Sequence, residues 1–134
     1  MNAEHTFVMV KPDGVRRGLV GEVIGRLERK GLRLERIEMR EIDEALARRH
    51  YAEHVEKGWF PELLSFITGG PVVAMEWSGR SAVQVVRDLM GATDPIDARP
   101  GTIRGDHAID QTQNLVHGSD STQSAERELS LFFG

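Results

Sequence analysis

The hydrophobic period changes part-way along residues 5–30, which read HTFVMVKPDGVRRGLVGEVIGRLERK. Residues 5–10 are mostly β-branched or apolar and lie just before Pro12, a pattern typical of a strand that stops at a proline. From residue 19 to residue 30 the apolar side chains recur at helical spacing, and Gly31 follows. These residues therefore predict a strand that leads into an amphipathic helix ended by a glycine.

The rest of the chain repeats this alternation. Further strands are expected at residues 32–39 (with a bulge where the alternation slips phase), 71–77 and 114–117. Helices are expected at residues 43–54 (capped by Asp43), 61–70, 81–90 and 121–133. The order is a split βαβ unit repeated, which predicts an α+β sandwich of ferredoxin-like type. Its four-stranded antiparallel sheet, in βαββαβ order, would be covered by helices.

Residues 91–113 show no sustained period and are rich in Gly, Pro, Asp and Arg. A structureless segment of about twenty residues is uncommon in so small a domain and is often functional when present. We therefore expect a long functional loop just before the last strand.

The composition is that of an ordinary globular protein, and 134 residues predict a single domain over residues 1–134. No apolar stretch approaches the roughly 20 residues of a membrane span, and residues 1–10 lack a signal-peptide pattern. The absence of cysteine excludes disulfides, thiolate nucleophiles and zinc–cysteine sites. We expect a cytoplasmic protein. Seventeen basic against 21 acidic residues argue against broad nucleic-acid binding but leave room for a local anion site.

Three cations stand where a polyphosphate ligand would need them. Lys11 follows the first strand, Arg87 lies off the apolar stripe of its helix, and Arg104 lies in the long loop. The alternative for each is a solvated side chain or a surface ion pair. Neither common glycine-rich phosphate loop is present, and Gly14 is expected to permit a turn into the first helix.

Two aromatic residues are candidates for nucleotide contacts. Tyr51 lies on one predicted helix and Trp59 near the start of the next, and an exposed aromatic ring can stack on a base, worth roughly 1–3 kcal/mol. The alternative is that either ring belongs to the core or to an interface.

Among the five histidines, His117 differs from the others. His5, His50 and His54 have polar neighbours and are expected at the surface, and the i, i+4 pair His50/His54 lacks an evident third metal ligand. His117 instead ends an apolar strand, and Gly118 after it would leave a ring nitrogen approachable. Two interpretations stay open: a reactive imidazole, or a histidine that caps the following helix.

Six stretches, in this order and spacing, resemble the nucleoside diphosphate kinase family: TFVMVKPDGVRRGLVGEVI, HYAEH, ITGGPVVAM, DLMGATDP, PGTIRGD and NLVHGSDS. The resemblance covers essentially the whole chain. It implies transfer of the γ-phosphate from a nucleoside triphosphate to a nucleoside diphosphate, by a ping-pong route through a phosphohistidine.

The resemblance also implies roles for individual residues. His117 matches the nucleophile, Glu128 the carboxylate that holds its other ring nitrogen, and Ser119 a nearby polar partner; Tyr51 matches a residue beside the histidine. Mg²⁺ is implied on the phosphates, with Asp120 as its contact through water. The implied ligands of the nucleotide are Lys11, Trp59, Arg87, Thr93, Arg104 and Asn114.

Four positions depart from the usual family sequence. Trp59 stands in place of the phenylalanine that stacks on the base, and Gly58 replaces a proline. Gln113 replaces an arginine and His107 an aromatic residue, neither of them a nucleotide ligand in the family. Family members are hexamers or tetramers of a common dimer, and the PGTIRGD loop favours a hexamer.

Two other classes of function remain as alternatives at this point. One is a nucleotide-binding or regulatory protein of the same fold without transfer activity, which the intact His117, Lys11 and Glu128 argue against. The other is a DNA- or protein-binding module, which the acidic balance disfavours for DNA.

Overall fold

The computed structural model describes residues 3–134, and its centre is a four-stranded antiparallel sheet with the strand order β2-β3-β1-β4. The strands are β1 (Glu4–Val10), β2 (Arg33–Arg40), β3 (Val72–Gly79) and β4 (Val116–Gly118). The α-helices are α1 (Pro12–Arg16), α2 (Val20–Lys30), α3 (Glu44–His50), α4 (Phe60–Ile67), α5 (Ala82–Met90), α6 (Ile103–His107) and α7 (Thr122–Phe133). The predicted ferredoxin-like α+β sandwich is confirmed.

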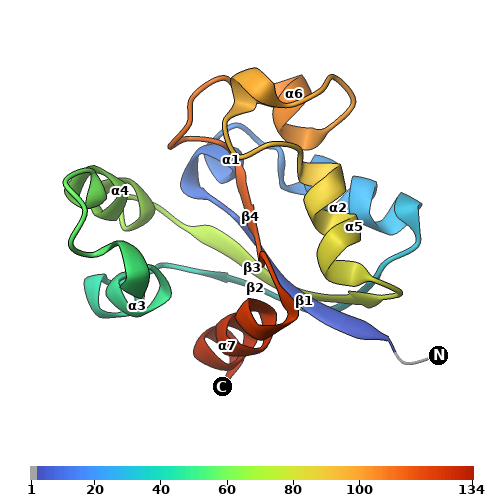
Figure 1. Ribbon diagram of the computed structural model, residues 1–134, viewed down its shortest axis with the longest axis horizontal. Helices are drawn as coiled ribbons and strands as arrows, with labels where there is room; N and C mark the ends of the chain where they lie inside the picture. The colour runs from blue at the N-terminus through green and yellow to red at the C-terminus, as the bar shows by residue number, and fades with distance from the viewer. Residues whose placement is uncertain (1–2) are drawn as a thin grey trace.

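The central strand β1 divides the core in two. Phe7 and Met9 point to one face of the sheet and Val8 and Val10 to the other, and all four side chains are fully buried. Helices α2 and α5 cover the valine face, whereas α3, α4 and α7 cover the Phe7 face (Figure 1). Both faces of β1 are thus apolar, which explains its continuous hydrophobic run.

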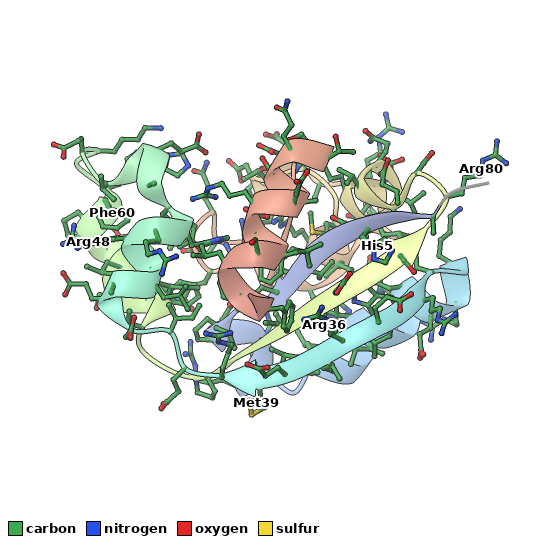
Figure 2. The ribbon with its side chains drawn as sticks, turned by 90° about the horizontal axis from the view of Figure 1, so that it is seen from below. His5, Arg36, Met39, Arg48, Phe60 and Arg80 are labelled. Carbon is green, nitrogen blue, oxygen red and sulfur yellow. The ribbon has the colours of Figure 1, made fainter. Side chains whose placement is uncertain are left out.

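Strand β2 forms one edge of the sheet and carries the predicted bulge. Its pairing with β3 shifts register between Leu34 and Arg36. Two large apolar side chains of this strand, Ile37 and Met39, are 49% and 62% exposed. Figure 2 shows β2 as an outer strand, with Arg36 along it and Met39 at its far end. This edge is therefore open in the isolated chain.

Two helix ends follow the chemistry predicted for them, at Gly31 and Asp43, and Ser121 caps a third helix. The αL conformation of Gly31 (φ 113°) ends α2. The side chain of Asp43 accepts a hydrogen bond from the Leu46 amide at the start of α3, and Ser121 accepts one from the Ser124 amide at the start of α7. These caps fix where the helices that carry site residues begin.

Two predicted elements need correction. The helix expected over residues 43–54 ends at His50 and continues as a 3₁₀ turn, Ala52–His54. The loop over residues 91–113 is not structureless, because it contains α6 and the 3₁₀ turn Pro95–Asp97.

No helix within residues 3–134 combines the length and the apolar character that crossing a bilayer requires.

Two glycines act through close approach rather than through a turn. Gly14 lies inside the short helix α1, where a Cβ would meet Val10 Cγ1 at 2.7 Å and the Leu115 carbonyl oxygen at 3.0 Å. A Cβ at Gly118 would meet the side chains of Met90 and Val86 at 2.9–3.0 Å. Gly14 thus lets α1 pack on the β4 segment, and Gly118 lets α5 pack on β4. The turn predicted at Gly14 is wrong, because this glycine lies inside α1 and the positive φ falls at Gly18.

Candidate active site

A cleft of about 440 Å³ lies where β1, β4 and α7 meet the α3 end and the long loop. Nine of the eleven predicted site residues line it, and they come from positions 11 to 128 of the chain. The lining includes Lys11, Tyr51, Arg87, Thr93, Arg104, Asn114, His117, Asp120 and Glu128. Ser119 lies behind it, bonded to Glu128, and Trp59 lies outside it.

His117 is held from one side by Glu128. The histidine lies on β4 opposite Met9 of β1, and its Nε2 is 3.1 Å from each carboxylate oxygen of Glu128 on α7. Within residues 3–134, no hydrogen bond involves its Nδ1, and the side chain is 23% exposed to the cleft. One ring nitrogen is therefore fixed and the other is approachable.

Glu128 is ionised in this setting. Burial acts to raise the pKa of its carboxyl, but hydrogen bonds from His117 and Ser119 and the charge of His117 outweigh it and lower the pKa below its ordinary value. The Ser119 hydroxyl donates to Oε1 at 2.6 Å, and Ser119 is itself 1% exposed. A buried carboxylate that accepts these bonds orients the imidazole ring of His117 and favours a proton on Nε2.

His50 lies against this pair, although the sequence placed it at the surface. It is 5% exposed, its ring centroid is 4.8 Å from that of His117, and its Nδ1 is 3.9 Å from Glu128 Oε2. Burial, aided by the positive potential of His117, lowers the pKa of His50 to about 3, so the ring is neutral. The surface prediction failed because it weighed the polar neighbours in sequence. The helical spacing of Ala47 and His50, both buried on α3, was the signal that could have found it.

Tyr51, the next residue, presents a phenol to the same cleft. It is 9% exposed, and its hydroxyl has no hydrogen-bond partner in the part of the chain that the structure describes. Burial and the negative charge of Glu128 raise the pKa of this phenol above its ordinary value. Tyr51 therefore stays protonated and has an O–H free to donate to a ligand.

Lys11 extends from the end of β1 into the cleft. Its Nζ donates to Asn114 Oδ1 at 2.8 Å, and its backbone amide donates to the Leu115 carbonyl at 2.8 Å. Burial, together with the charge of Arg104, lowers the pKa of Lys11 to about 8, with Asp13 acting in the opposite direction. The site is thus short of negative charge, which an anionic ligand would supply.

Arg104 joins the long loop to β4. Its guanidinium donates to three backbone carbonyls, those of Gly91 (3.1 Å), Asn114 (3.3 Å) and Val116 (2.6 Å). Burial, and then the charge of Arg87, lower the pKa of Arg104 to about 10. This arginine therefore has two effects: it fixes the loop, and it places positive charge in the cleft.

The segment between Arg104 and β4 is strained and firmly held. Leu115 is fully buried with φ 76°, a conformation that is costly for a residue with a side chain. Asp13 Oδ2 accepts the Leu115 amide at 3.1 Å. Asn114 Nδ2 donates to the carbonyls of Thr93 and Gln111, each at 3.0 Å. These bonds set Asn114 and His117 in register.

Arg127, which the sequence analysis did not single out, ties α7 to α3. Its guanidinium donates to the carbonyls of Arg49 and His50 at the C-terminus of α3. Positive charge is favourable there because the helix dipole leaves its last carbonyls negative. The side chain also lines the cleft, so it links the helix of Glu128 to the residues His50 and Tyr51.

Trp59 lies apart from these residues. It is 50% exposed and is not among the described residues that line the cleft. Its ring is 5.1 Å from the ring of His54, which does line the cleft, and Lys57 Nζ is 5.3 Å from its centroid. The indole thus lies beside the cleft wall and is half exposed to solvent.

Asp120 places a carboxylate at the cleft. Hydrogen bonding from Ser124, and the charge of Arg87, lower the pKa of Asp120 below its ordinary value. It is therefore an ionised, exposed carboxylate, the kind of ligand that Mg²⁺ accepts together with phosphate oxygens and water.

The likeness to known proteins extends over almost the whole chain. The family model described as nucleoside diphosphate kinase matches residues 4–134. The chain belongs to the nucleoside diphosphate kinase family.

Several relatives are close. A nucleoside diphosphate kinase of Archaeoglobus fulgidus is 63% identical over 130 residues, 97% of this chain and 86% of that protein. One of Thermobifida fusca is 59% identical over 130 residues, 97% and 96% of the two chains. Among solved structures, a halophilic nucleoside diphosphate kinase from Halobacterium salinarum in complex with CDP is 57% identical. It has a TM-score of 0.96 and covers 98% of this chain and 88% of that one. The chain is a nucleoside diphosphate kinase-type phosphotransferase that moves phosphate between nucleotides.

Two of the departures from the usual nucleoside diphosphate kinase sequence lie in the long loop and bear on its packing. His107 Nε2 is 3.4 Å from Arg26 Nη2 and 3.6 Å from Glu22 Oε2, and its carbonyl accepts from Arg17. It therefore joins the loop to α2. The backbone amide of Gln113 donates to Asp110 Oδ1 at 2.8 Å, a contact that its side chain does not affect.

Proposed function

We propose that His117 Nδ1 attacks the γ-phosphorus of a nucleoside triphosphate. The bond from phosphorus to the bridging β–γ oxygen breaks, a nucleoside diphosphate leaves, and the phosphoryl group stays on Nδ1 as phosphohistidine. A terminal oxygen of a second nucleoside diphosphate then attacks this phosphorus and releases the free imidazole. The observation that carries this proposal is the pairing of His117 Nε2 with an ionised, buried Glu128 while Nδ1 is left to the cleft.

Glu128 would act by choosing the tautomer. A neutral imidazole has one N–H, and Glu128 accepts it from Nε2, so the lone pair stands on Nδ1. As the N–P bond forms, the ring gains positive charge, which the carboxylate stabilises. Ser119 would keep the carboxylate in place through its bond to Oε1.

The cations and hydroxyls of the cleft would hold the phosphates. Phosphoryl transfer requires mainly alignment and compensation of charge, and Lys11, Arg87 and Arg104 supply that charge. The Tyr51 hydroxyl, which has no partner among the described residues, would donate to a phosphate oxygen. Thr93 and Asn114 also line the cleft and would be further ligands of the nucleotide.

Mg²⁺ is the cation that we propose for the bound nucleotide. The ionised Asp120 fits it as a hard oxygen ligand, acting through water, next to where the phosphates would lie. When bound, Mg²⁺ supplies further neutralisation of the phosphate oxygens.

We propose that the base of the nucleotide stacks on Trp59. Its exposed ring can stack on any base, because every base has a π face, and stacking carries no base-edge code. This mode of recognition would accept nucleotides of different bases.

We further propose that the single domain works in the cytoplasm as a self-associating protein, a hexamer rather than a tetramer. The open edge of β2 supports association, because exposed apolar side chains on an unpaired edge favour a partner surface. Two more exposed residues of the long loop, Ile96 (70%) and Ile109 (77%), could serve a second contact. Sedimentation velocity measures the assembly directly.

The experiment for the transfer reaction uses γ-labelled ATP with Mg²⁺ and no acceptor, on wild type and His117→Ala in parallel. Acid-labile, base-stable label is expected on wild type alone, and added GDP should remove it as GTP. A folded wild type that binds ATP but takes up no label would contradict transfer and favour a nucleotide-binding protein.

A further inference from the structure

We infer that His50, His117 and Glu128 form a binding site for a borderline transition-metal cation such as Zn²⁺, and that the bound cation stops phosphorylation of His117. The second half of this inference rests on the proposed function. The three residues come from α3, β4 and α7, and one ligand atom from each lies within 4.8 Å of the other two.

The distances suit a small cation after modest movement. Glu128 Oε2 is 3.1 Å from His117 Nε2 and 3.9 Å from His50 Nδ1. Zinc binds nitrogen and oxygen at about 2.0–2.2 Å, so ligand atoms around it stand roughly 3.3 Å apart. Shifts of about 1 Å or less per side chain would bring these three atoms onto one ion, and water from the cleft could take the fourth position.

His50 provides an independent reason to expect a ligand here. Its side chain is 1% exposed, and neither ring nitrogen has a hydrogen-bond partner among residues 3–134. Buried polar atoms without partners are rare, because burial removes their bonds to water. The ring is packed against Phe7 and Phe132, with centroids 6.1 Å and 5.3 Å away. Coordination through Nδ1 would satisfy a nitrogen that the fold otherwise leaves alone.

Ser119 prepares the carboxylate for this role. Its hydroxyl donates to Oε1 of Glu128, which leaves Oε2 as the oxygen nearest both histidines. Hydrogen bonds of this kind to a ligating carboxylate hold it in the orientation a metal needs.

The chemistry of the three ligands selects the metal. Two imidazoles and one carboxylate suit Zn²⁺, Co²⁺ or Ni²⁺, whereas Mg²⁺ prefers a shell of oxygen atoms and keeps its water. The Mg²⁺ that accompanies the nucleotide would therefore not compete for this site.

Inhibition would follow from the position of one proton. A cation on His117 Nε2 takes that nitrogen's lone pair, so the single N–H of the neutral ring moves to Nδ1. The nitrogen that faces the cleft then has no lone pair with which to attack phosphorus. Glu128 alone has the opposite effect, since it keeps the proton on Nε2. The nucleotide contacts stay in place, so the fraction of active enzyme falls while KM is unchanged.

Cobalt(II) allows the site to be observed without activity. Metal-free protein is titrated with Co²⁺ in millimolar Mg²⁺, and the visible absorption of a low-symmetry, four- or five-coordinate ion is expected at one equivalent, displaced by Zn²⁺. His50→Gln should weaken Co²⁺ binding by more than about tenfold, since ligand loss costs at least as much as loss of an outer-shell partner. The matched control His54→Gln, four residues along the chain and not part of the cluster, should bind Co²⁺ as wild type does.

Imidazole NMR of wild type keeps the test independent of whether His50→Gln folds. Zn²⁺ should shift the ring resonances of His50 and His117 and leave those of His5 unchanged. Unshifted His50 resonances at saturating Zn²⁺, or equal Co²⁺ affinity in folded His50→Gln, would overturn the site.

Kinetics tests the inhibition separately. Zn²⁺ should lower kcat in wild type without changing KM, and His50→Gln should resist it; a rise in KM alone would overturn the tautomer argument. Failure of wild type to form phosphohistidine without Zn²⁺ would instead overturn the proposed function, with the Co²⁺ spectrum still deciding the metal site.

Discussion

The two ends of the cleft are built differently. At the proposed reaction end, Glu128, Lys11 and Arg104 are 5–8% exposed, and each is bonded to a residue outside its own helix or strand. At the other end, Trp59 is half exposed and its contacts are His54 and Lys57, both within five residues of it. The proposed reaction end is therefore buried and held by bonds between different segments, whereas Trp59, the proposed stacking residue, is exposed and contacts only its neighbours in sequence.

This difference matches what each end has to do. Transfer of a phosphoryl group depends on fixed distances and fixed charges, so misplacement is costly. Stacking on a base tolerates small shifts and different ring shapes. Mutations should therefore have large effects on rate at the buried end and moderate effects on affinity at the exposed end.

Replacement of His117 tests the buried end most severely. His117→Ala should lower transfer from ATP to GDP by at least about 10⁴-fold, because the covalent route is lost. Steady-state rates measure this, with ADP binding as the control for an intact cleft. Residual transfer within tenfold of wild type would show that another residue carries the phosphoryl group.

Removal of the charge on Glu128 comes next. Glu128→Gln keeps the shape but no longer stabilises the positive ring, and it should reduce kcat by about 10²- to 10⁴-fold. Single-turnover phosphorylation measures the step itself. Glu126→Gln, on an exposed position of the same helix, is the matched control and should behave as wild type. Similar rates in the two variants would contradict the role of Glu128.

The exposed end should respond through affinity. Trp59→Ala should weaken nucleotide binding by about 5- to 100-fold, which corresponds to the usual energy of one stacked ring, and leave kcat nearly unchanged. Trp59→Phe should restore most of the loss. Tryptophan fluorescence measures binding, and Trp77, fully buried in the core, gives a constant background. No change in wild-type fluorescence with ADP, together with unchanged affinity of Trp59→Ala, would remove Trp59 from the site.

The buried end should also show a pH limit that the exposed end lacks. Because the pKa of Lys11 is about 8 in the free protein, kcat/KM should fall about tenfold between pH 7 and pH 9 as the ammonium loses its proton. Lys11→Arg should lack this limb, since arginine stays charged. The same limb in Lys11→Arg would assign the titration to another group.

The stability of the free protein should change in the opposite direction over that range. The pKa of Lys11 is lower in the folded than in the unfolded chain, so the unfolded chain binds more protons between pH 8 and about 10.5. The contribution of Lys11 to the free energy of unfolding is therefore least favourable below pH 8 and improves as pH rises. Urea titrations of wild type and Lys11→Met isolate it; a flat difference between them would contradict burial of the charge.

The fold could be predicted because its signals are local. The apolar run of β1, the helical stripe of α2 with Gly31, and the caps Asp43 and Ser121 each act within a few residues. The resemblance to the family then placed Glu128, Lys11 and His117 together, which spacing alone could not do.

The remaining features depend on neighbours that are distant in sequence. Gly14 and Gly118 are needed because Leu115 and Met90 approach them, and nothing near them in the chain reveals this. His50 is buried because α7 and β1 cover it. The three carbonyls that Arg104 binds lie on two separate segments. Such contacts exist only once the topology is known.

The pairing of β4 with β1 has a consequence for how the chain folds. Lys11 and Asn114, which meet in the cleft, are separated by 103 positions, and contacts of such long range form slowly because a large loop must close first. The proposed phosphate site therefore assembles only when the last strand docks. A nucleotide that binds the finished site adds its binding energy to the native state alone. In a cell rich in ATP, the nucleotide would thus stabilise the folded chain only after β4 has docked. Chains in which β4 has not docked would carry no activated phosphate.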